Sequence, residues 1–125
     1  MDVADNVEYG SLSPREARLL FRQGLVRQTS GMCYGYLQLS MKMIPQRHAF
    51  DFLLFCQRNP APQPVVEVLE AGVYAPRLLA TGADVRTDCP RYRVWNQGKV
   101  TATVNEITPY WRDDLVTFFV GGSFT

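Results

Sequence analysis

The sequence predicts a folded protein that mixes helices with strands, an α+β or mixed α/β class, and three observations lead to it. Ser13, Pro14 and Glu16 form a capping pattern that opens a helical segment. Residues 37–43 alternate apolar and polar side chains, as a half-buried strand does. Residues 91–104 contain two β-prone runs around a Gly-containing turn, which predicts a hairpin.

The first half of the chain is expected to hold a flexible start and two helices around the first strand. Residues 1–10 are polar and lack periodicity, so they should fray. The first helix should cover 13–23, because Gly24 can adopt the left-handed conformation that ends a helix. The apolar side chains expected to face inward there are Leu19, Leu20 and Leu25. A second helix over 45–58 is apolar almost all round, which predicts a central place in the core.

The second half is expected to continue with strands and to close with a helix. Residues 65–69 predict a strand, and residues 72–81 a connection that leads to the hairpin. Thr108 and Pro109 fit a helix cap and a first helical position, so we expect a last helix over 108–120. Residues 118–125 combine an apolar run with a small-residue turn, which favours a longer fold of which this chain is a fragment.

Composition and charge exclude several classes of protein. The chain has 125 residues, of which 46% are hydrophobic and 12% aromatic, so it is not a disordered segment. Its 13 basic and 12 acidic residues leave a net charge of +1, which provides no electrostatic footprint for nucleic acid or an anionic membrane. No apolar run approaches the roughly 18 residues that cross a bilayer. We therefore expect neither nucleic-acid nor membrane partners.

The cysteines and the single histidine argue against a metal centre. Cys33, Cys56 and Cys89 lack CxxC spacing, and no charged-then-apolar leader precedes them. This pattern favours a reduced, cytoplasmic setting. Because His48 is the only histidine, a zinc site of the usual three or four ligands is not expected.

The segment 82–95 carries the residues best suited to chemistry. Arg86, Arg91 and Arg93 offer fork-shaped donors. Thr87 adds a hydroxyl and Asp88 a potential proton acceptor. Such a set can bind a small carboxylate and take part in its chemical reaction. The alternative is a polar loop entering an exposed strand, in which Arg86 and Asp88, two residues apart in an extended segment, pair only with each other.

A second group of candidates lies upstream. Thr29, Ser30 and Gly31 can present hydroxyls and backbone amides to an oxyanion, although such residues also cap turns and helices. Gln38 falls on the polar face of its predicted strand, where it is exposed unless another layer covers it. Asn59, which precedes a proline, most simply caps the end of the second helix.

Four ordered motifs resemble the D-glutamate cyclase family. They are T-S-G-x-x-x-G-Y-x-Q at 29–38, A-F-D-F-L-L-F-C-Q-R-N-P at 49–60, D-V-R-T-D-x-P-R-Y-R-V at 84–94, and W-R-D-D-L-V-T-F followed by G-x-S-F at 111–124. The resemblance extends from about Pro14 to the last residue, and members of the family continue further. Several positions depart from the usual pattern: Met32, Cys33 and Tyr34 fill the first loop, Ser40 replaces an Asn, Gln63 and Gly122 replace cysteines, and Thr125 replaces a Ser.

The resemblance implies the N-terminal part of a lyase that closes D-glutamate to 5-oxo-D-proline with loss of water. It implies no obligatory organic cofactor. It also implies a layered α/β core, here residues 11–64 and 108–125, interrupted by a smaller α+β subdomain at 65–107 that contains the hairpin. Residues 1–10 precede this core as a flexible N-terminus.

In such a reaction each candidate has a role. Arg86 would clamp a carboxylate and Asp88 would accept a proton from the amine, with Thr87 beside them as a third catalytic candidate. Binding of the amino or carboxylic acid substrate would fall to Thr29, Ser30, Gly31, Gln38, Asn59, Arg91 and Tyr92. Three alternatives remain open: a non-catalytic module that binds a small carboxylate, a hydro-lyase for another hydroxy or amino acid, and a fragment that associates with itself or with a missing C-terminal half.

Overall fold

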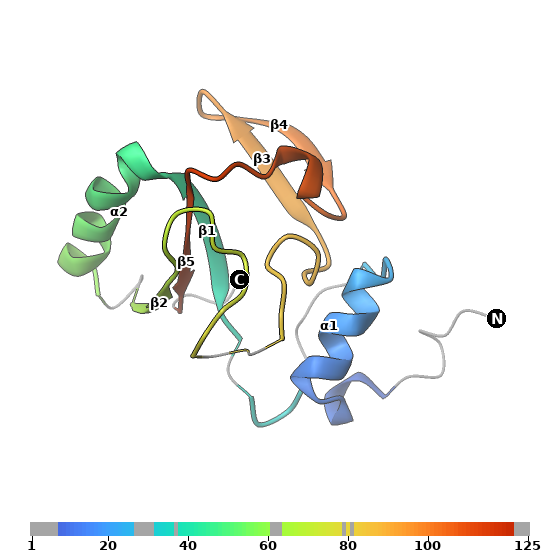
Figure 1. The fold of residues 1–125 in the computed structure, drawn as a ribbon. Coiled ribbons are helices and arrows are strands. Elements are labelled where there is room, and N and C mark those ends of the chain that lie inside the picture. Colours follow the sequence, from blue (N-terminus) through green and yellow to red (C-terminus); the bar gives the residue numbers. More distant parts are fainter. Residues whose placement is uncertain are drawn as a thin grey trace. The chain divides into compact units, whose positions relative to one another are not determined.

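The computed structural model confirms the mixed class, with helices and antiparallel sheets (Figure 1). It describes residues 8–26, 32–36, 38–60, 64–78, 80 and 82–121. The chain divides into two compact units, one of Met1–Tyr36 with Ala83–Tyr110 and the other of Leu37–Gly82 with Trp111–Thr125. The expected division into a core and a smaller subdomain stays a prediction. Within the described ranges, no helix is long and apolar enough to cross a membrane.

The first unit begins with a short 3-10 turn, Tyr9–Ser11, and helix α1, Pro14–Arg22. The capping pattern forms as predicted: the Glu16 amide donates to Ser13 Oγ at 3.2 Å, and the Ser13 amide donates to Glu16 Oε1 at 2.9 Å. Gly24 follows the helix with φ +107°, the predicted left-handed stop. Local sequence signals are therefore sufficient to define both ends of α1.

The packing of α1 differs from the expectation at one leucine. Its buried side chains are Ala17 and Phe21, one turn apart, and they contact Met32 and Cys33. Leu19 is 41% exposed, because it lies off this stripe, so its predicted inward orientation is wrong. The predicted fraying is also wrong for Gly10, which is buried; positions 1–7 lie outside the described residues.

The predicted hairpin is confirmed in the same unit. Strands β3, Tyr92–Asn96, and β4, Lys99–Val104, pair antiparallel, with an irregularity between Val94 and Trp95. Gln97 and Gly98 form the two-residue loop, with φ of +51° and +78°. Two consecutive positive φ values are those of a type I′ turn, whose twist matches that of the strands.

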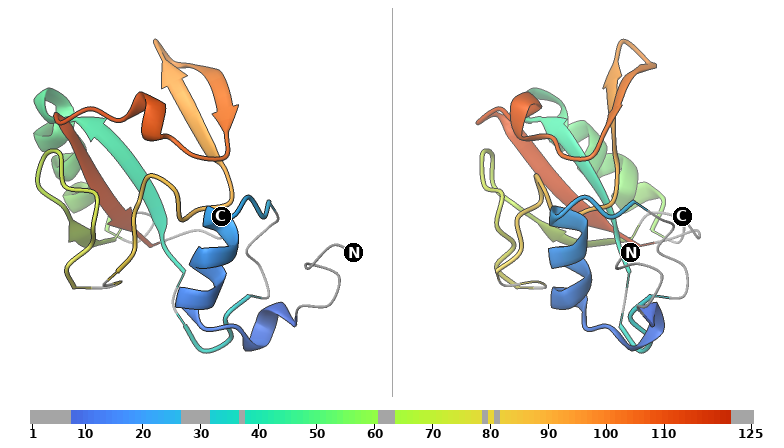
Figure 2. Two further views of the ribbon diagram at one scale, coloured as in Figure 1. Left: turned by 45° about the vertical axis from the view of Figure 1, so that its right-hand side comes forward. Right: turned by 90° about the vertical axis from the view of Figure 1, so that its right-hand side faces the viewer.

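The second unit is built on a three-stranded antiparallel sheet in the order β1, β5, β2. These strands are Ser40–Pro45, Leu115–Val120 and Val65–Val68 respectively. Helix α2, Gln46–Arg58, lies along one face of the sheet (Figure 2). The buried side chains between helix and sheet are Cys56, Val116, Phe118 and Val120. Strand β1 begins later than the alternation over 37–43 indicates, while α2 and β2 agree with their predicted ranges to within a residue or so.

The predicted last helix over 108–120 is wrong. Thr108–Tyr110 forms only a single 3-10 turn, and Leu115–Val120 is the central strand β5. The side chains of Val116 to Val120 are all buried, and the strand has a hydrogen-bonded neighbour on each side. A continuous apolar run that is rich in β-branched and aromatic residues suits such a strand, but periodicity alone does not separate it from a buried helix.

The predicted central burial of α2 is also wrong for this chain. Cys56 is its one fully buried residue, whereas Phe50 is 72% exposed and Phe55 is 51% exposed. The helix contacts β1 and β5 through a single side. Part of its apolar surface, at Phe50 and Phe55, is therefore exposed in the described part of the chain.

Candidate functional site

The motif D-V-R-T-D at 84–88 folds as a turn rather than as the extended segment expected from the sequence. The amides of Thr87 and Asp88 donate to the Asp84 carbonyl at 3.2 and 3.0 Å. The Arg86 amide donates to Asp84 Oδ1 at 2.9 Å, which is the local pattern of an Asx turn. Arg86 and Asp88 consequently do not pair with each other, and each finds a different partner.

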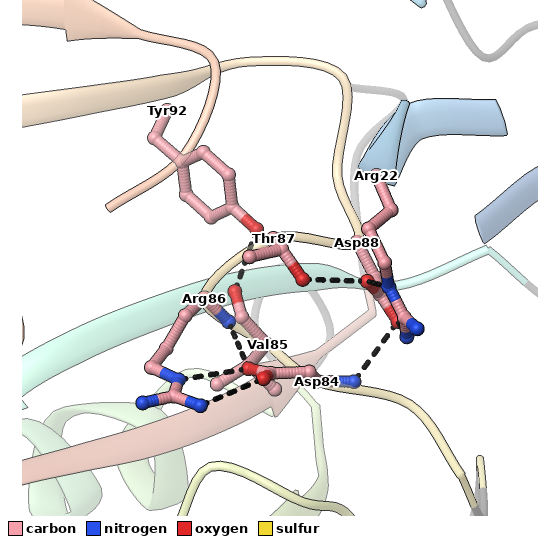
Figure 3. Close-up of polar contacts among 7 residues, drawn as sticks. All are labelled: Arg22, Asp84, Val85, Arg86, Thr87, Asp88 and Tyr92. Carbon is pink, nitrogen blue, oxygen red and sulfur yellow. Dashed lines mark hydrogen bonds and ion pairs between the residues drawn. The ribbon is translucent and has the colours of Figure 1, made fainter. Parts of the chain in front are cut away.

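Asp88 is the centre of the cluster in Figure 3. Arg22, at the end of α1, donates from Nε to Oδ1 at 2.8 Å and from Nη2 to Oδ2 at 2.7 Å. Thr87 Oγ1 donates to Oδ1 at 2.8 Å, and the Asp84 amide donates to Oδ2 at 2.9 Å. The Asp88 side chain is only 3% exposed. Four donors therefore satisfy a buried carboxylate.

The pKa of Asp88 is lowered by this environment. Burial is the largest single influence and by itself raises the pKa, because it disfavours the charged form. Hydrogen bonds from Arg22, the Asp84 amide and Thr87, together with the charge of Arg22, outweigh it. The hydrogen bond and charge of Asp88 in turn raise the pKa of Arg22. The pair is fully ionised at neutral pH, so Asp88 is a weak base in this arrangement.

A second guanidinium–carboxylate pair lies beside the first. Arg86 donates from Nε to Asp84 Oδ1 at 3.0 Å and from Nη2 to Asp84 Oδ2 at 2.9 Å. The two side chains are 23% and 24% exposed, so this pair is more open to solvent than Asp88 is. The Arg86 carbonyl accepts from the Ile107 amide at 2.9 Å, and this hydrogen bond links the turn to the segment after β4.

Tyr92 connects the cluster to the hairpin. Its hydroxyl donates to the Val85 carbonyl at 2.6 Å, and its side chain is buried (Figure 3). Burial raises the pKa of Tyr92 well above its ordinary value, and burial also raises the pKa of Cys89 to about 11. Both groups are neutral at physiological pH, so neither serves as an anionic nucleophile here.

The other predicted site residues lie elsewhere. Arg91 is exposed just before β3. Gln38 and Asn59 belong to the second unit; Gln38 is exposed, and Asn59 Nδ2 donates to the Phe55 carbonyl at 2.8 Å, which confirms the predicted helix cap. Thr29, Ser30 and Gly31 lie outside the described residues. The structure thus brings together Arg86, Thr87, Asp88 and Tyr92.

Sequence reasoning missed two members of the cluster, Arg22 and Asp84. Arg22 is 66 positions from Asp88, and no local pattern connects a basic residue in the last turn of a helix to a distant carboxylate. Asp84 did carry a signal, because an Asp two residues before an Arg favours a turn in which its side chain accepts the backbone amide. In the described part of the chain, no group of three or more metal-ligating side chains is found.

We expect the Asp88 cluster to make the free energy of unfolding depend on pH in the acid range. A carboxyl whose pKa is lower in the folded state contributes stability above its unfolded pKa of about 3.9, and this stability is lost as pH falls through the folded value. Denaturant unfolding between pH 7 and pH 2.5 should therefore show a free energy of unfolding that falls below about pH 5. Asp88→Asn should flatten this dependence, and identical profiles for the two proteins would contradict the assignment.

Comparison with known proteins identifies relatives across nearly the whole chain. No family model matches it. A protein of Thermoanaerobacter sp. (strain X514) is 47% identical over 122 residues, which are 97% of this chain and 46% of the relative. A protein of Mycolicibacterium gilvum is 49% identical over 96% of this chain and 45% of its own length. A Bacillus subtilis protein is 48% identical over 91% of this chain and 45% of its own length.

All three carry the words "Putative hydro-lyase" in their names. The chain is homologous to one portion of these proteins. It spans less than half of the length of the relatives it matches, as expected for a fragment of a larger fold. The D-V-R-T-D turn and its partners therefore lie within the part that the chain shares with them.

Proposed function

We propose that this chain is part of a hydro-lyase that acts on a small amino or carboxylic acid. The observation that carries the proposal is the identity of 47–49% to proteins named as hydro-lyases over 91–97% of the chain. The resemblance of the motifs at 29–38, 49–60, 84–94 and 111–124 favours D-glutamate as the substrate. Closure of D-glutamate to 5-oxo-D-proline forms one C–N bond and releases the displaced carboxyl oxygen as water.

The cluster supports a division of roles within this reaction. Arg86 is the candidate for holding a substrate carboxylate, because its guanidinium is part-exposed and carries five N–H donors, of which Asp84 accepts from two. Asp88 has four donors and a lowered pKa, so its proposed contribution is to position Thr87 and the Asp84 amide. Tyr92 supports the turn from the hairpin side through the Val85 carbonyl. The roles of Thr29, Ser30 and Gly31 as an oxyanion cradle stay predictions.

The test is product formation from single enantiomers. This chain, alone and joined to the portion of the Bacillus subtilis relative that it does not span, is incubated with D-glutamate or L-glutamate. 5-Oxoproline is followed by chiral chromatography. We expect 5-oxoproline from the D-enantiomer with the joined protein. A folded joined protein that forms no 5-oxoproline from either enantiomer would reject D-glutamate cyclisation.

Two arginine variants test the site. Arg86→Ala should lower kcat/KM by about 100-fold, the size of effect that loss of one strong polar contact to the transition state produces. Arg93→Ala removes an exposed guanidinium from β3 and should leave the rate within about twofold. Equal effects of the two substitutions would argue against a carboxylate clamp at Arg86. Saturable D-glutamate binding without turnover would instead favour a carboxylate-binding module.

A further inference from the structure

An open apolar groove lies between α2 and the edge strand β2 in the second unit. Its volume is about 560 Å³. Most of its lining is apolar, and the polar residues Gln46 and Glu70 lie at it as well; the lining residues are Gln46, Ala49, Val68, Leu69, Glu70, Ala71 and Val116. Val116 belongs to the buried layer between helix and sheet, so the groove opens directly onto the core of the unit. The groove therefore leaves exposed apolar surface of the kind that proteins usually bury.

The groove exists because α2 covers only part of the sheet. The helix packs on β1 and β5. Val68 pairs in register with Phe118, and directly opposed residues share a face, so Val68 points to the helix side of the sheet. Val68 is nevertheless 43% exposed, so this side of β2 is only partly covered at Val68.

The flank of α2 that borders the groove is apolar as well. Gln46 and Ala49 line the groove, and Phe50 lies one helical turn beyond Gln46 on the same side of α2. Phe50 is 72% exposed. Alanine and valine side chains of α2, β2 and β5 line the groove, and the exposed Phe50 follows on α2 just beyond it, so this surface suits an apolar segment of polypeptide.

We propose that a segment from the portion of the relatives that this chain does not span docks in this groove, beside α2 and over β2. The length of the relatives supports this occupant, because more than half of each relative lies outside the matched region. In a layered fold a second helix lies about 8–10 Å from the first on the same face of the sheet, which is the position that the groove leaves open. The inference is independent of the reaction proposed above.

Thiol labelling tests the proposal with a matched pair of positions. Val68 and Val100 are both strand valines, 43% and 44% exposed, and Val100 lies on β4 in the other unit. Val68→Cys and Val100→Cys are introduced into this chain and into the joined protein that carries the rest of the Bacillus subtilis relative. We expect Val68→Cys to react at least tenfold more slowly in the joined protein, with the rate of Val100→Cys unchanged.

Three results would overturn the proposal. They are an unchanged labelling rate of Val68→Cys in a folded joined protein, equal protection of both positions, and protection of Val68→Cys that rises with the concentration of this chain alone. The third result would assign the groove to a second copy. A parallel experiment produces the two portions as separate chains. It should give a one-to-one complex that Phe50→Glu abolishes and Val100→Glu does not, and recovery of the two portions without a complex would contradict the proposal.

Discussion

Asp88→Ala is expected to reduce the free energy of unfolding of the first unit by about 2–4 kcal/mol. The substitution leaves Arg22, the Thr87 hydroxyl and the Asp84 amide without the acceptor that they now share. The Arg22 side chain is 42% exposed and can regain water, which keeps the cost below that of a fully buried pair. Denaturant unfolding followed by circular dichroism measures the change.

A double-mutant cycle isolates the pair itself. Arg22→Ala should also destabilise, because it leaves the Asp88 carboxylate buried without its counter-charge. The double variant should cost less than the sum of the single ones. The pair Arg112 and Asp114 is the matched control, since its atoms lie 3.1 Å apart but its side chains are 55% and 44% exposed. A coupling energy at Arg22–Asp88 no larger than that of the control would refute a structural role for the pair.

Gly72→Ala is expected to destabilise the second unit by about 2–4 kcal/mol. Gly72 has φ +80°, and a left-handed conformation costs an alanine about 1–2 kcal/mol. A Cβ at this position would lie 2.9 Å from the carbonyl oxygen and 3.3 Å from the Cα of Asp113. These atoms belong to the backbone, so a change of side-chain rotamer cannot relieve the clash. The Gly72 amide also donates to the Leu115 carbonyl at 2.9 Å. A backbone shift that relieves the clash would therefore weaken this hydrogen bond at the start of β5.

Gly98→Ala separates the two contributions. Gly98 has φ +78°, and a Cβ built there meets nothing within 4 Å. Its substitution should therefore cost only the conformational part, about 1 kcal/mol. The two variants are compared by the midpoints of thermal and denaturant unfolding. A Gly72→Ala protein no less stable than the Gly98→Ala protein would show that the Asp113 backbone does not hold Gly72 as tightly as the contact distances indicate.

The elements that sequence analysis predicted well are those whose signals are local. Helix α1 begins at Ser13 because its hydroxyl and Glu16 satisfy the first free amides, and residues three apart make that contact in any fold. The hairpin turn at Gln97 and Gly98 is equally local. Strand β5 was predicted as a helix, because the choice between the two depends on partners more than forty positions away, namely β1 and β2.

The mixed class, the ends of α1, the hairpin and the segment that carries Arg86, Thr87 and Asp88 could be read from the amino-acid sequence alone. The contact between Asp88 and Arg22 and the exposure of Phe50 on α2 could be learned only from the folded structure. The difference lies in how far apart along the chain the contacting residues are. Helix caps and tight turns form their hydrogen bonds within a few residues of the chain. A buried charge finds its partner, and an apolar helix face its covering segment, among residues that are far apart in the sequence and meet only on folding.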